Sequence, residues 1–304
     1  MQIAFIGLGA MGLPMASHLL EACPGMLVSS ASGRAFPALE RLGARPTHDR
    51  GALADCDTVF LCLPNDAVVE EVLFSSQGLA QWMRPGSTVV DTSTSGHAQT
   101  LEIDRRLAAL GLRFLDAPVS GMAQRAADAT LTVMCGGEAQ VVENMRPYLK
   151  TMASSVLHMG PAGSGQLAKL VNQLLYNINI AALAEIMPMA CKLGLDPQQI
   201  TQVVNSGTGR SHASEYFLPR ILADDFSSGY PLENAYKDIR QGVQLSATMG
   251  LPLPVLTAAT TTYQTALLQG HGHLDKGAMI KVFETLLGVH FRSPESQLVS
   301  PRFE

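Results

Sequence analysis

Four polar side chains in the middle of the chain stand at the spacing of one helix face. They are Lys169, Asn172, Gln173 and Tyr176, at positions i, i+3, i+4 and i+7 of an otherwise apolar stretch. A lysine whose pKa is lowered by burial or by a nearby cation can protonate a carbonyl oxygen or take the proton of an alcohol. The pattern predicts a polar stripe facing a cleft, with Lys169 as the candidate acid or base. A solvated or salt-bridged lysine is the alternative that the residues alone leave open.

A glycine-rich turn near the N-terminus has the spacing G-x-G-x-x-G. Gly7, Gly9 and Gly12 follow the short apolar run Ile3–Ile6 and open a helical pattern. The first glycine permits a tight turn, the second lets a pyrophosphate approach the backbone, and the third lets the helix pack on its strand. This context predicts a dinucleotide site, in which Leu8, Ala10 and Met11 also line the turn. A turn that serves packing alone is the alternative.

The residues after the second predicted strand indicate which dinucleotide is bound. A site for NAD usually has an acidic residue there for the ribose 2′-hydroxyl. No acidic residue occurs from Ala22 to Leu39, and the segment offers Ser30 and Arg34 instead. Hydroxyl and guanidinium groups suit a 2′-phosphate, so the sequence favours NADP over NAD. A solvated Arg34 at a helix start is the alternative.

A second candidate site follows the predicted strand Leu112–Asp116. Ser120 and Gly121 come after Pro118, which stiffens the turn. A serine hydroxyl and backbone N–H groups at the carboxyl end of a strand can bind a carboxylate. An ordinary turn explains these residues equally well. For Asp116 we favour a structural role over that of a general base.

Histidines and cysteines form no convincing metal site. His271 and His273 flank a glycine in a loop that we expect to be solvated. The cysteines are odd in number, lack C-x-x-C spacing, and fit reduced, buried thiols. They are Cys23, Cys56, Cys62, Cys135 and Cys191. Neither a G-x-S-x-G elbow nor a P-loop occurs, so hydrolases and kinases that depend on them are excluded.

Short apolar runs alternate with helical patterns through the first 160 residues. The predicted strands are Ile3–Ile6, Met26–Ser29, Thr58–Leu63, Ser87–Asp91, Leu112–Asp116, Leu131–Cys135 and Ser155–His158. The predicted helices are Gly12–Ala22, Phe36–Leu42, Ala67–Leu73, Ala98–Leu110 and Ala139–Leu149. This alternation predicts an α/β Rossmann-type domain with a parallel sheet, to which the last two strands could add an edge.

After His158 the pattern becomes helical throughout. A breaker-rich stretch ends at Gly165, and a long helix is expected from there to about Leu193, with Gly194 as its C-cap. We expect an all-α C-terminal domain joined to the sheet by this helix. The predicted divisions are a dinucleotide-binding domain at 1–161, a substrate and oligomerisation domain at 162–292, and a frayed tail at 293–304.

Composition describes a folded protein with small-molecule partners. Of 304 residues 47% are hydrophobic and 15% charged, which excludes a disordered chain. A net charge of −5 without basic runs argues against nucleic acid. The N-terminus lacks the basic region of a signal peptide, and polar residues interrupt the apolar stretch Leu167–Leu195. We therefore expect a soluble, cytoplasmic protein without a membrane partner. The apolar helical half predicts a homo-oligomer.

Several motifs together resemble the β-hydroxyacid dehydrogenase family, part of the 6-phosphogluconate dehydrogenase superfamily, which includes 3-hydroxyisobutyrate dehydrogenase and tartronate semialdehyde reductase. Residues 7–16, GLGAMGLPMA, are similar to the family's glycine signature, and residues 116–121 match DAPVSG. Gly163 to Asn172 resembles G-x-G-x-x-x-K-x-x-N, and Lys237-Asp238 resembles the family's KD pair. The motifs occur in the expected order over nearly the whole chain.

The resemblance implies an NAD(P)-dependent oxidoreductase that interconverts a small β-hydroxyacid and its semialdehyde. Lys169 would be catalytic, and Asn172 would hold the substrate. Ser120 and Gly121 would bind its carboxylate, and Lys237 would lie beside cofactor and substrate. The nicotinamide end would be contacted by Leu63, Pro64, Asn65, Ser93 and Thr94. A homodimer or homotetramer is also implied.

Two departures from the family pattern bear on the substrate. Met122 stands where a third glycine is usual, and Gln173 stands where many members have a second Asn. A 6-phosphogluconate dehydrogenase would carry His after K-x-V, where this chain has Asn172, and imine reductases usually lack the lysine. A related reductase acting on another carbonyl or imine, and a non-catalytic dinucleotide sensor, are the alternatives.

Overall fold

The computed structural model describes residues 2–227 and 229–293. The chain divides into two compact units, Met1–Lys169 and Leu170–Glu304. Apart from Ser293, the predicted tail at 293–304 lies outside the described residues.

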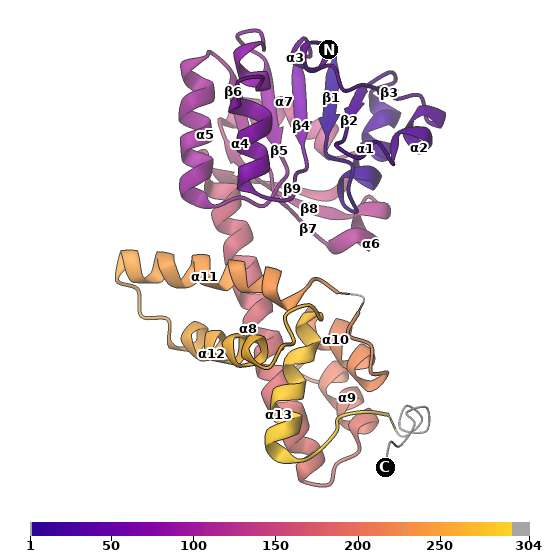
Figure 1. Cartoon of the computed structure of the whole chain (residues 1–304), viewed down its shortest axis with the longest axis vertical. Helices are drawn as coiled ribbons and strands as arrows, with labels where there is room; N and C mark the ends of the chain where they lie inside the picture. The colour runs from indigo at the N-terminus through magenta and orange to yellow at the C-terminus, as the bar shows by residue number, and fades with distance from the viewer. Residues whose placement is uncertain (1, 228, 294–304) are drawn as a thin grey trace. The chain divides into compact units, whose positions relative to one another are not determined.

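A twisted sheet organises the first unit (Figure 1). Its strands are β1 (Ile3–Ile6), β2 (Leu27–Ser29), β3 (Arg45–Pro46), β4 (Thr58–Leu61), β5 (Thr88–Asp91), β6 (Arg113–Asp116), β7 (Val119–Ser120), β8 (Leu131–Gly137) and β9 (Ala153–Gly160). The order is β3-β2-β1-β4-β5-β6-β8-β7, and β9 pairs with β8. Strands β1 to β6 run parallel in the Rossmann order. β8 runs antiparallel to β6 and β7. A parallel-dominated Rossmann-type sheet is thereby confirmed.

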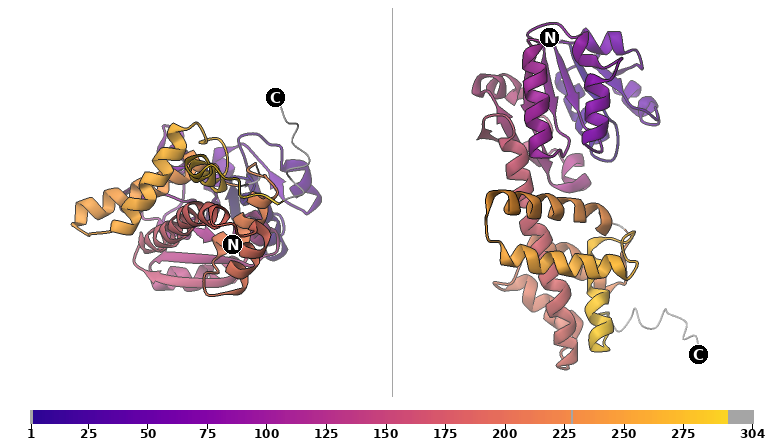
Figure 2. Two further views of the ribbon diagram at one scale, coloured as in Figure 1. Left: turned by 90° about the horizontal axis from the view of Figure 1, so that it is seen from below. Right: turned by 60° about the vertical axis from the view of Figure 1, so that its left-hand side comes forward.

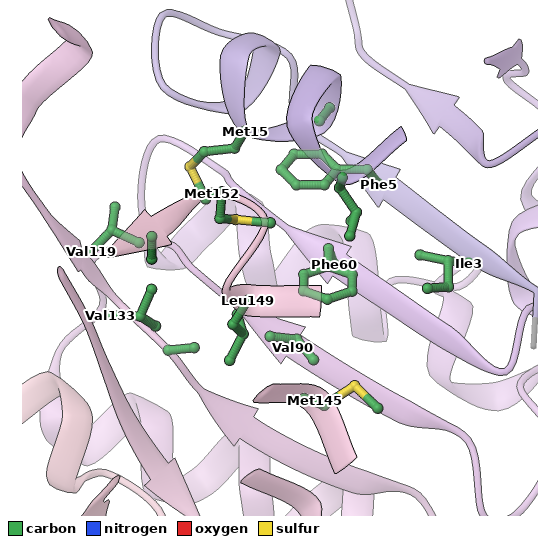
Figure 3. Packing of buried hydrophobic residues seen from close by; sticks show 14 of the residues in the cluster. Ile3, Phe5, Met15, Phe60, Val90, Val119, Val133, Met145, Leu149 and Met152 are labelled. Carbon is green, nitrogen blue, oxygen red and sulfur yellow. The ribbon is translucent and has the colours of Figure 1, made fainter. Parts of the chain in front are cut away.

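Alternating side chains of the strands feed two apolar layers, one on each face of the sheet. Ile3 and Phe5 of β1 join one layer, and Ala4 and Ile6 join the other. The first layer contains buried residues of α1 (Gly12–Ala22), α2 (Phe36–Arg41), α6 (Met122–Ala127) and α7 (Ala139–Leu149). Figure 3 shows its packing around Phe5, Phe60 and Met152. The second layer contains buried residues of α3 (Arg50–Ala54), α4 (Asp66–Phe74) and α5 (His97–Ala109).

The second unit is built from helices, as expected. α8 (Ser164–Lys192) ends before Gly194, whose φ of +85° lies in the left-handed region. The remaining helices are α9 (Pro197–Ser206), α10 (His212–Leu222), α11 (Leu232–Met249), α12 (Pro254–Leu268), the short 3₁₀ helix Lys276–Met279 and α13 (Ile280–Leu287). α11 and α12 lie side by side in all views (Figure 1, Figure 2). Ile180, Ala184 and Met187 of α8 belong to the unit's apolar core.

α8 is long and apolar enough to cross a membrane, judged by length and composition alone. Within the described residues it is the single helix that passes this test. The core helix of a soluble protein passes it too, and α8 supplies part of the core of the second unit. A single helix of this kind is weak evidence for a membrane span.

Candidate active site

The turn after β1 has the geometry that a dinucleotide needs. Gly7 has a φ of +100°, and a Cβ there would lie 2.2 Å from the carbonyl oxygen of Cys62. A Cβ on Gly12 would lie 1.9 Å from the carbonyl oxygen of Gly7. Nothing lies within 4 Å of a Cβ built on Gly9, and Gly9 is exposed. Two glycines thus allow the turn to close, and the third leaves its outer side open to a ligand.

The N-terminus of α1 lies beside this opening. No side chain caps the helix, and its first turn has no acidic residue. Its leading N–H groups are therefore suited to phosphate oxygens. Ala10 is exposed and Met11 half-buried, whereas the side chain of Leu8 is buried in the apolar layer. Leu8 can therefore serve a dinucleotide through its backbone only. These features fit a pyrophosphate.

The segment after β2 holds the two residues predicted to select NADP. Ser30 is half-buried and Arg34 is exposed. The backbone N–H of Arg34 donates to Ser32 Oγ over 3.4 Å, and Gly33 between them has a φ of +62°. Since β2 pairs directly with β1, the segment begins next to the glycine turn.

Residues after β4 approach the β5–α5 loop. The backbone N–H of Leu63 donates to Ser93 Oγ over 2.8 Å. Asn65 Oδ1 accepts from the N–H of Val68 over 3.1 Å, so Asn65 caps α4. Pro64, Asn65 and Thr94 are exposed. The predicted strand Thr58–Leu63 is two residues too long, because β4 ends at Leu61 and the chain then turns toward Ser93.

A buried carboxyl group anchors the β5–α5 loop. Asp91 is 1% exposed, and its Oδ1 accepts from the N–H of Ser93 over 2.9 Å. Burial raises the pKa of Asp91 to about 6, while hydrogen bonds from Ser93 oppose the shift. The repulsion of Asp116 on the neighbouring strand raises it further.

The raised pKa of Asp91 predicts a pH dependence of stability. A carboxyl group whose pKa is higher in the folded protein stabilises the fold at low pH, and this contribution disappears as pH rises from about 4 to about 6. Asp91→Asn keeps an oxygen acceptor for Ser93 and carries no charge, so it should remove this dependence. Urea unfolding of both proteins should show that the free energy of unfolding of Asp91→Asn, relative to that of wild type, increases by about 2–3 kcal/mol between pH 4 and pH 8. If the free energies of unfolding of the two proteins changed in parallel with pH, the raised pKa of Asp91 would be contradicted.

Asp116 takes a structural position at the start of α8. It is fully buried, and its Oδ1 accepts from the N–H of Gly163 over 2.7 Å. Its Oδ2 accepts from the N–H of Gln166 over 2.9 Å. Burial raises the pKa of Asp116, and these backbone hydrogen bonds oppose the shift. The carboxyl group therefore fixes the first turn of α8 to the sheet.

The candidate catalytic lysine lies beside the candidate carboxylate site. Lys169 Nζ donates to the carbonyl oxygen of Val119 over 2.8 Å. Val119 and Ser120 form the two-residue strand β7, within the turn that the sequence predicts after Pro118. Gly121 has a φ of +144°, and Met122 has a φ of +61°, a conformation that favours glycine. Ser120, Gly121 and Met122 are each half-buried, so they are within reach of solvent.

The second unit contains the other predicted substrate residues. Asn172 is exposed on α8, one turn after Lys169, and Lys237 is exposed on α11. Gln173 Nε2 donates to Asp238 Oδ2 over 3.1 Å, which brings the Lys237-Asp238 pair to α8. Tyr176 departs from the predicted stripe, because its hydroxyl is buried and its ring lies beside Phe217.

One polar residue of this region received no role from the sequence. Gln166, in the first turn of α8, is 3% exposed and hydrogen-bonds on both sides of Thr94. The one feature of the sequence that could have indicated a role for Gln166 is its position one helical turn before Lys169. Its partners, however, lie about 70 residues earlier in the chain, beyond any local pattern.

Comparison with known proteins identifies the family. Residues 2–160 match the NAD-binding domain of 6-phosphogluconate dehydrogenase, and residues 163–283 match the NAD-binding model of NADP-dependent 3-hydroxyisobutyrate dehydrogenase. The chain is 33% identical to 2-(hydroxymethyl)glutarate dehydrogenase of Eubacterium barkeri over 95% of this chain and 96% of the relative. The chain belongs to the β-hydroxyacid dehydrogenase family.

Other members of the β-hydroxyacid dehydrogenase family agree with this assignment. 2-Hydroxy-3-oxopropionate reductase of Escherichia coli is 31% identical over 94% of this chain and 98% of its own. The crystal structure of 3-hydroxyisobutyrate dehydrogenase from Salmonella typhimurium has a TM-score of 0.84 at 31% identity, covering 93% and 99% of the two chains. As a β-hydroxyacid dehydrogenase, the protein is an NAD(P)-binding oxidoreductase of small hydroxyacids.

Proposed function

We propose that this protein interconverts a small β-hydroxyacid and its semialdehyde, with Lys169 as general acid and base. The observation that carries the proposal is the hydrogen bond from Lys169 Nζ to the carbonyl oxygen of Val119. It holds the amine next to Ser120 and Gly121, where a substrate carboxylate can bind. The carboxylate end of a small hydroxyacid would therefore be bound close to the amine that transfers the proton.

Lys169 provides the proton chemistry that a carbonyl reduction requires. The bound dinucleotide would supply the hydride. As negative charge develops on the carbonyl oxygen, the Lys169 ammonium donates a proton to it. In the oxidation direction, the neutral amine takes the hydroxyl proton. An ammonium has three N–H donors, so the bond to the Val119 carbonyl orients Nζ without using up its capacity to donate to a substrate oxygen.

The carboxylate would be held by the last residue of β7 and the residues that follow it. The Ser120 hydroxyl and the backbone N–H groups at Gly121 supply donors, and the positive φ of Gly121 and Met122 turns the chain there. We assign Asn172, one turn beyond Lys169 on α8, to the substrate. We assign Lys237 to the substrate and the cofactor. Met122, with a side chain where glycine is usual in the family, would narrow the site.

We propose NADP as the preferred cofactor, with NAD as the alternative. Exposed Arg34 and half-buried Ser30 follow β2 without an acidic residue nearby in the chain. Arg34→Ala should raise the KM for NADP⁺ by about 10-fold, the worth of one charge-assisted hydrogen bond, and leave the KM for NAD⁺ within about 2-fold. Steady-state kinetics with both nucleotides test this. Arg105→Ala, at an exposed ion pair on α5, is the control. An equal effect on both nucleotides would overturn the preference.

The protein is also proposed to act as a soluble, cytoplasmic homodimer or homotetramer with small-molecule partners rather than nucleic acid or membrane. Large apolar side chains are exposed along one helix, α8, and would be covered by a second copy. They are Val171, Leu175, Ile186 and Met189. Light scattering at micromolar concentration should give the mass of two or four chains, and the mass of one chain would contradict the proposal.

Reduction of NADP⁺ or NAD⁺ by a set of small β-hydroxyacids, followed by absorbance, tests the reaction class. We expect turnover with acids that carry the carboxylate and little with their methyl esters, because the esters lack the charge that Ser120 and Gly121 would bind. Equal rates with acids and esters would contradict the carboxylate site.

A further inference from the structure

A single side chain holds the loop around Thr94 from both sides. Gln166 Nε2 donates to the carbonyl oxygen of Ser93 over 2.8 Å. Gln166 Oε1 accepts from the backbone N–H of Ser95 over 3.1 Å. Both partners are backbone groups, one on each side of Thr94. The carboxamide therefore fixes the main chain at Thr94, and Thr94 itself is exposed.

Gln166 is itself fixed and buried. Its backbone N–H donates to Asp116 Oδ2 over 2.9 Å, which ties the first turn of α8 to the end of β6. The residue is 3% exposed, so water cannot readily replace the two bonds of its side chain. Lys169 follows one helical turn later and binds the carbonyl oxygen of Val119. One rigid segment thus carries both the clamp on Thr94 and the lysine.

We propose that Gln166 is a positioning residue that sets Thr94, which the family resemblance assigns to the nicotinamide end of the cofactor, relative to Lys169. The inference rests on the proposed function, in which the hydride and the proton reach one carbonyl group together. The distance between the group that donates the hydride and the group that donates the proton then matters for kcat, because a displacement of about 1 Å can cost about 100-fold in rate.

The carboxamide is the group that this position requires. It donates to Ser93 and accepts from Ser95 at the same time. A carboxylic acid does the same only when protonated, because a carboxylate has no hydrogen to donate. Leucine, of similar size, does neither. The three side chains therefore differ in hydrogen bonding while nearly conserving volume.

Ionisable groups near Gln166 would influence the pKa of a glutamate placed at this position. Asp116 on β6 bonds its backbone, Asp91 on β5 anchors Ser93, and His97 on α5 lies against Gly163. Asp66 on α4 accepts from the backbone N–H of Gly96 in the same loop. The pKa values of Asp91 and Asp116 are raised by burial. Burial and these carboxyl groups should likewise raise the pKa of a carboxyl group at 166 above its usual value of about 4.3.

The test compares Gln166→Glu and Gln166→Leu with wild type from pH 5 to pH 9. We expect kcat of Gln166→Glu, divided by that of wild type, to fall by about 10–100-fold as pH rises and the introduced carboxyl group ionises. Gln166→Leu, which places no charge in the interior, should be slower than wild type by a similar factor at every pH. Dissociation constants for NADPH should stay within about 3-fold, because the glycine turn is unchanged.

Gln140→Glu on the exposed face of α7 is the matched control, and its ratio to wild type should not vary with pH. Thermal unfolding at each pH separates loss of folded protein from loss of rate. A pH-independent ratio for Gln166→Glu, or a kcat of Gln166→Leu equal to wild type, would overturn the inference. Absence of turnover in wild type would instead contradict the proposed function, so the two failures are distinguishable.

Discussion

Replacing Lys169 with alanine is expected to lower kcat by about 10²–10⁴-fold in both directions, the usual contribution of a positioned acid or base. The residue donates to the Val119 carbonyl beside Ser120, so its loss removes the proton donor and leaves the backbone of β7 in place. Binding of NADPH, measured by fluorescence titration, should change by less than about 3-fold, since α1 and the glycine turn are untouched.

Lys192→Ala is a close control for this experiment. Lys192 lies at the other end of α8 and also donates to a backbone carbonyl, that of Leu287, over 2.9 Å. It should retain wild-type rates. Lys169→Ala activity within a few-fold of wild type would show that another group transfers the proton. A loss of NADPH binding equal to the loss of rate would show that Lys169 binds the cofactor rather than acting in the chemical step.

The glycines of the turn after β1 should respond in opposite ways to alanine. At Gly9 a Cβ meets no atom within 4 Å, and the φ is not in the left-handed region. Gly9→Ala should therefore fold with unchanged stability and bind NADPH about 10–100-fold more weakly, because the methyl group would occupy the space of the pyrophosphate. At Gly12 the Cβ would lie 1.9 Å from the Gly7 carbonyl oxygen, so Gly12→Ala must displace the turn or the helix.

Urea unfolding and NADPH titration of both variants check this prediction. Gly12→Ala should lose stability, by about 1–3 kcal/mol as for other overpacked sites, together with cofactor binding. Gly9→Ala serves as its control for stability. Wild-type affinity in Gly9→Ala would mean that the pyrophosphate does not approach this glycine, and the assignment of the site would then be wrong.

The strand and the helix on either side of the glycine turn could be predicted to the residue. The bounds of β1, α1 and α7 agree with the sequence prediction. A buried parallel strand is a continuous apolar run, and the following G-x-G-x-x-G defines where the strand stops and the helix begins. Local sequence contains all of this information.

Short elements could not be predicted because they contain too few residues to show a periodic pattern of apolar side chains. β3 and β7 have two residues each, and α3 and α6 have five and six. Strands of this length are defined by their partners: Val119 pairs with Val133, fourteen residues away. The antiparallel direction of β8 against β6 likewise depends on a long-range contact.

In the candidate site, too, some features follow from local sequence and others depend on long-range contacts. The glycine turn and the helix face of Lys169 follow from spacing, which is local. The bond from Lys169 to Val119 and the clamp of Gln166 on the Thr94 loop join segments 50 or more residues apart. Sequence alone therefore indicated Lys169 and Thr94 as candidates. The fold showed that the Val119 carbonyl orients Lys169 and that Gln166, which received no role from the sequence, holds the loop of Thr94.

The most direct test of the central claim is isotope transfer from NADPH that carries deuterium at the reacting carbon of its nicotinamide. Wild-type protein and Lys169→Ala would be incubated with small carboxylate-bearing semialdehydes, and the products analysed by mass spectrometry. We predict a β-hydroxyacid with deuterium on the former carbonyl carbon, formed rapidly by wild type and at least about 100-fold more slowly by Lys169→Ala. Deuterium transfer that is equally fast without Lys169, or no transfer to any semialdehyde, would contradict the account.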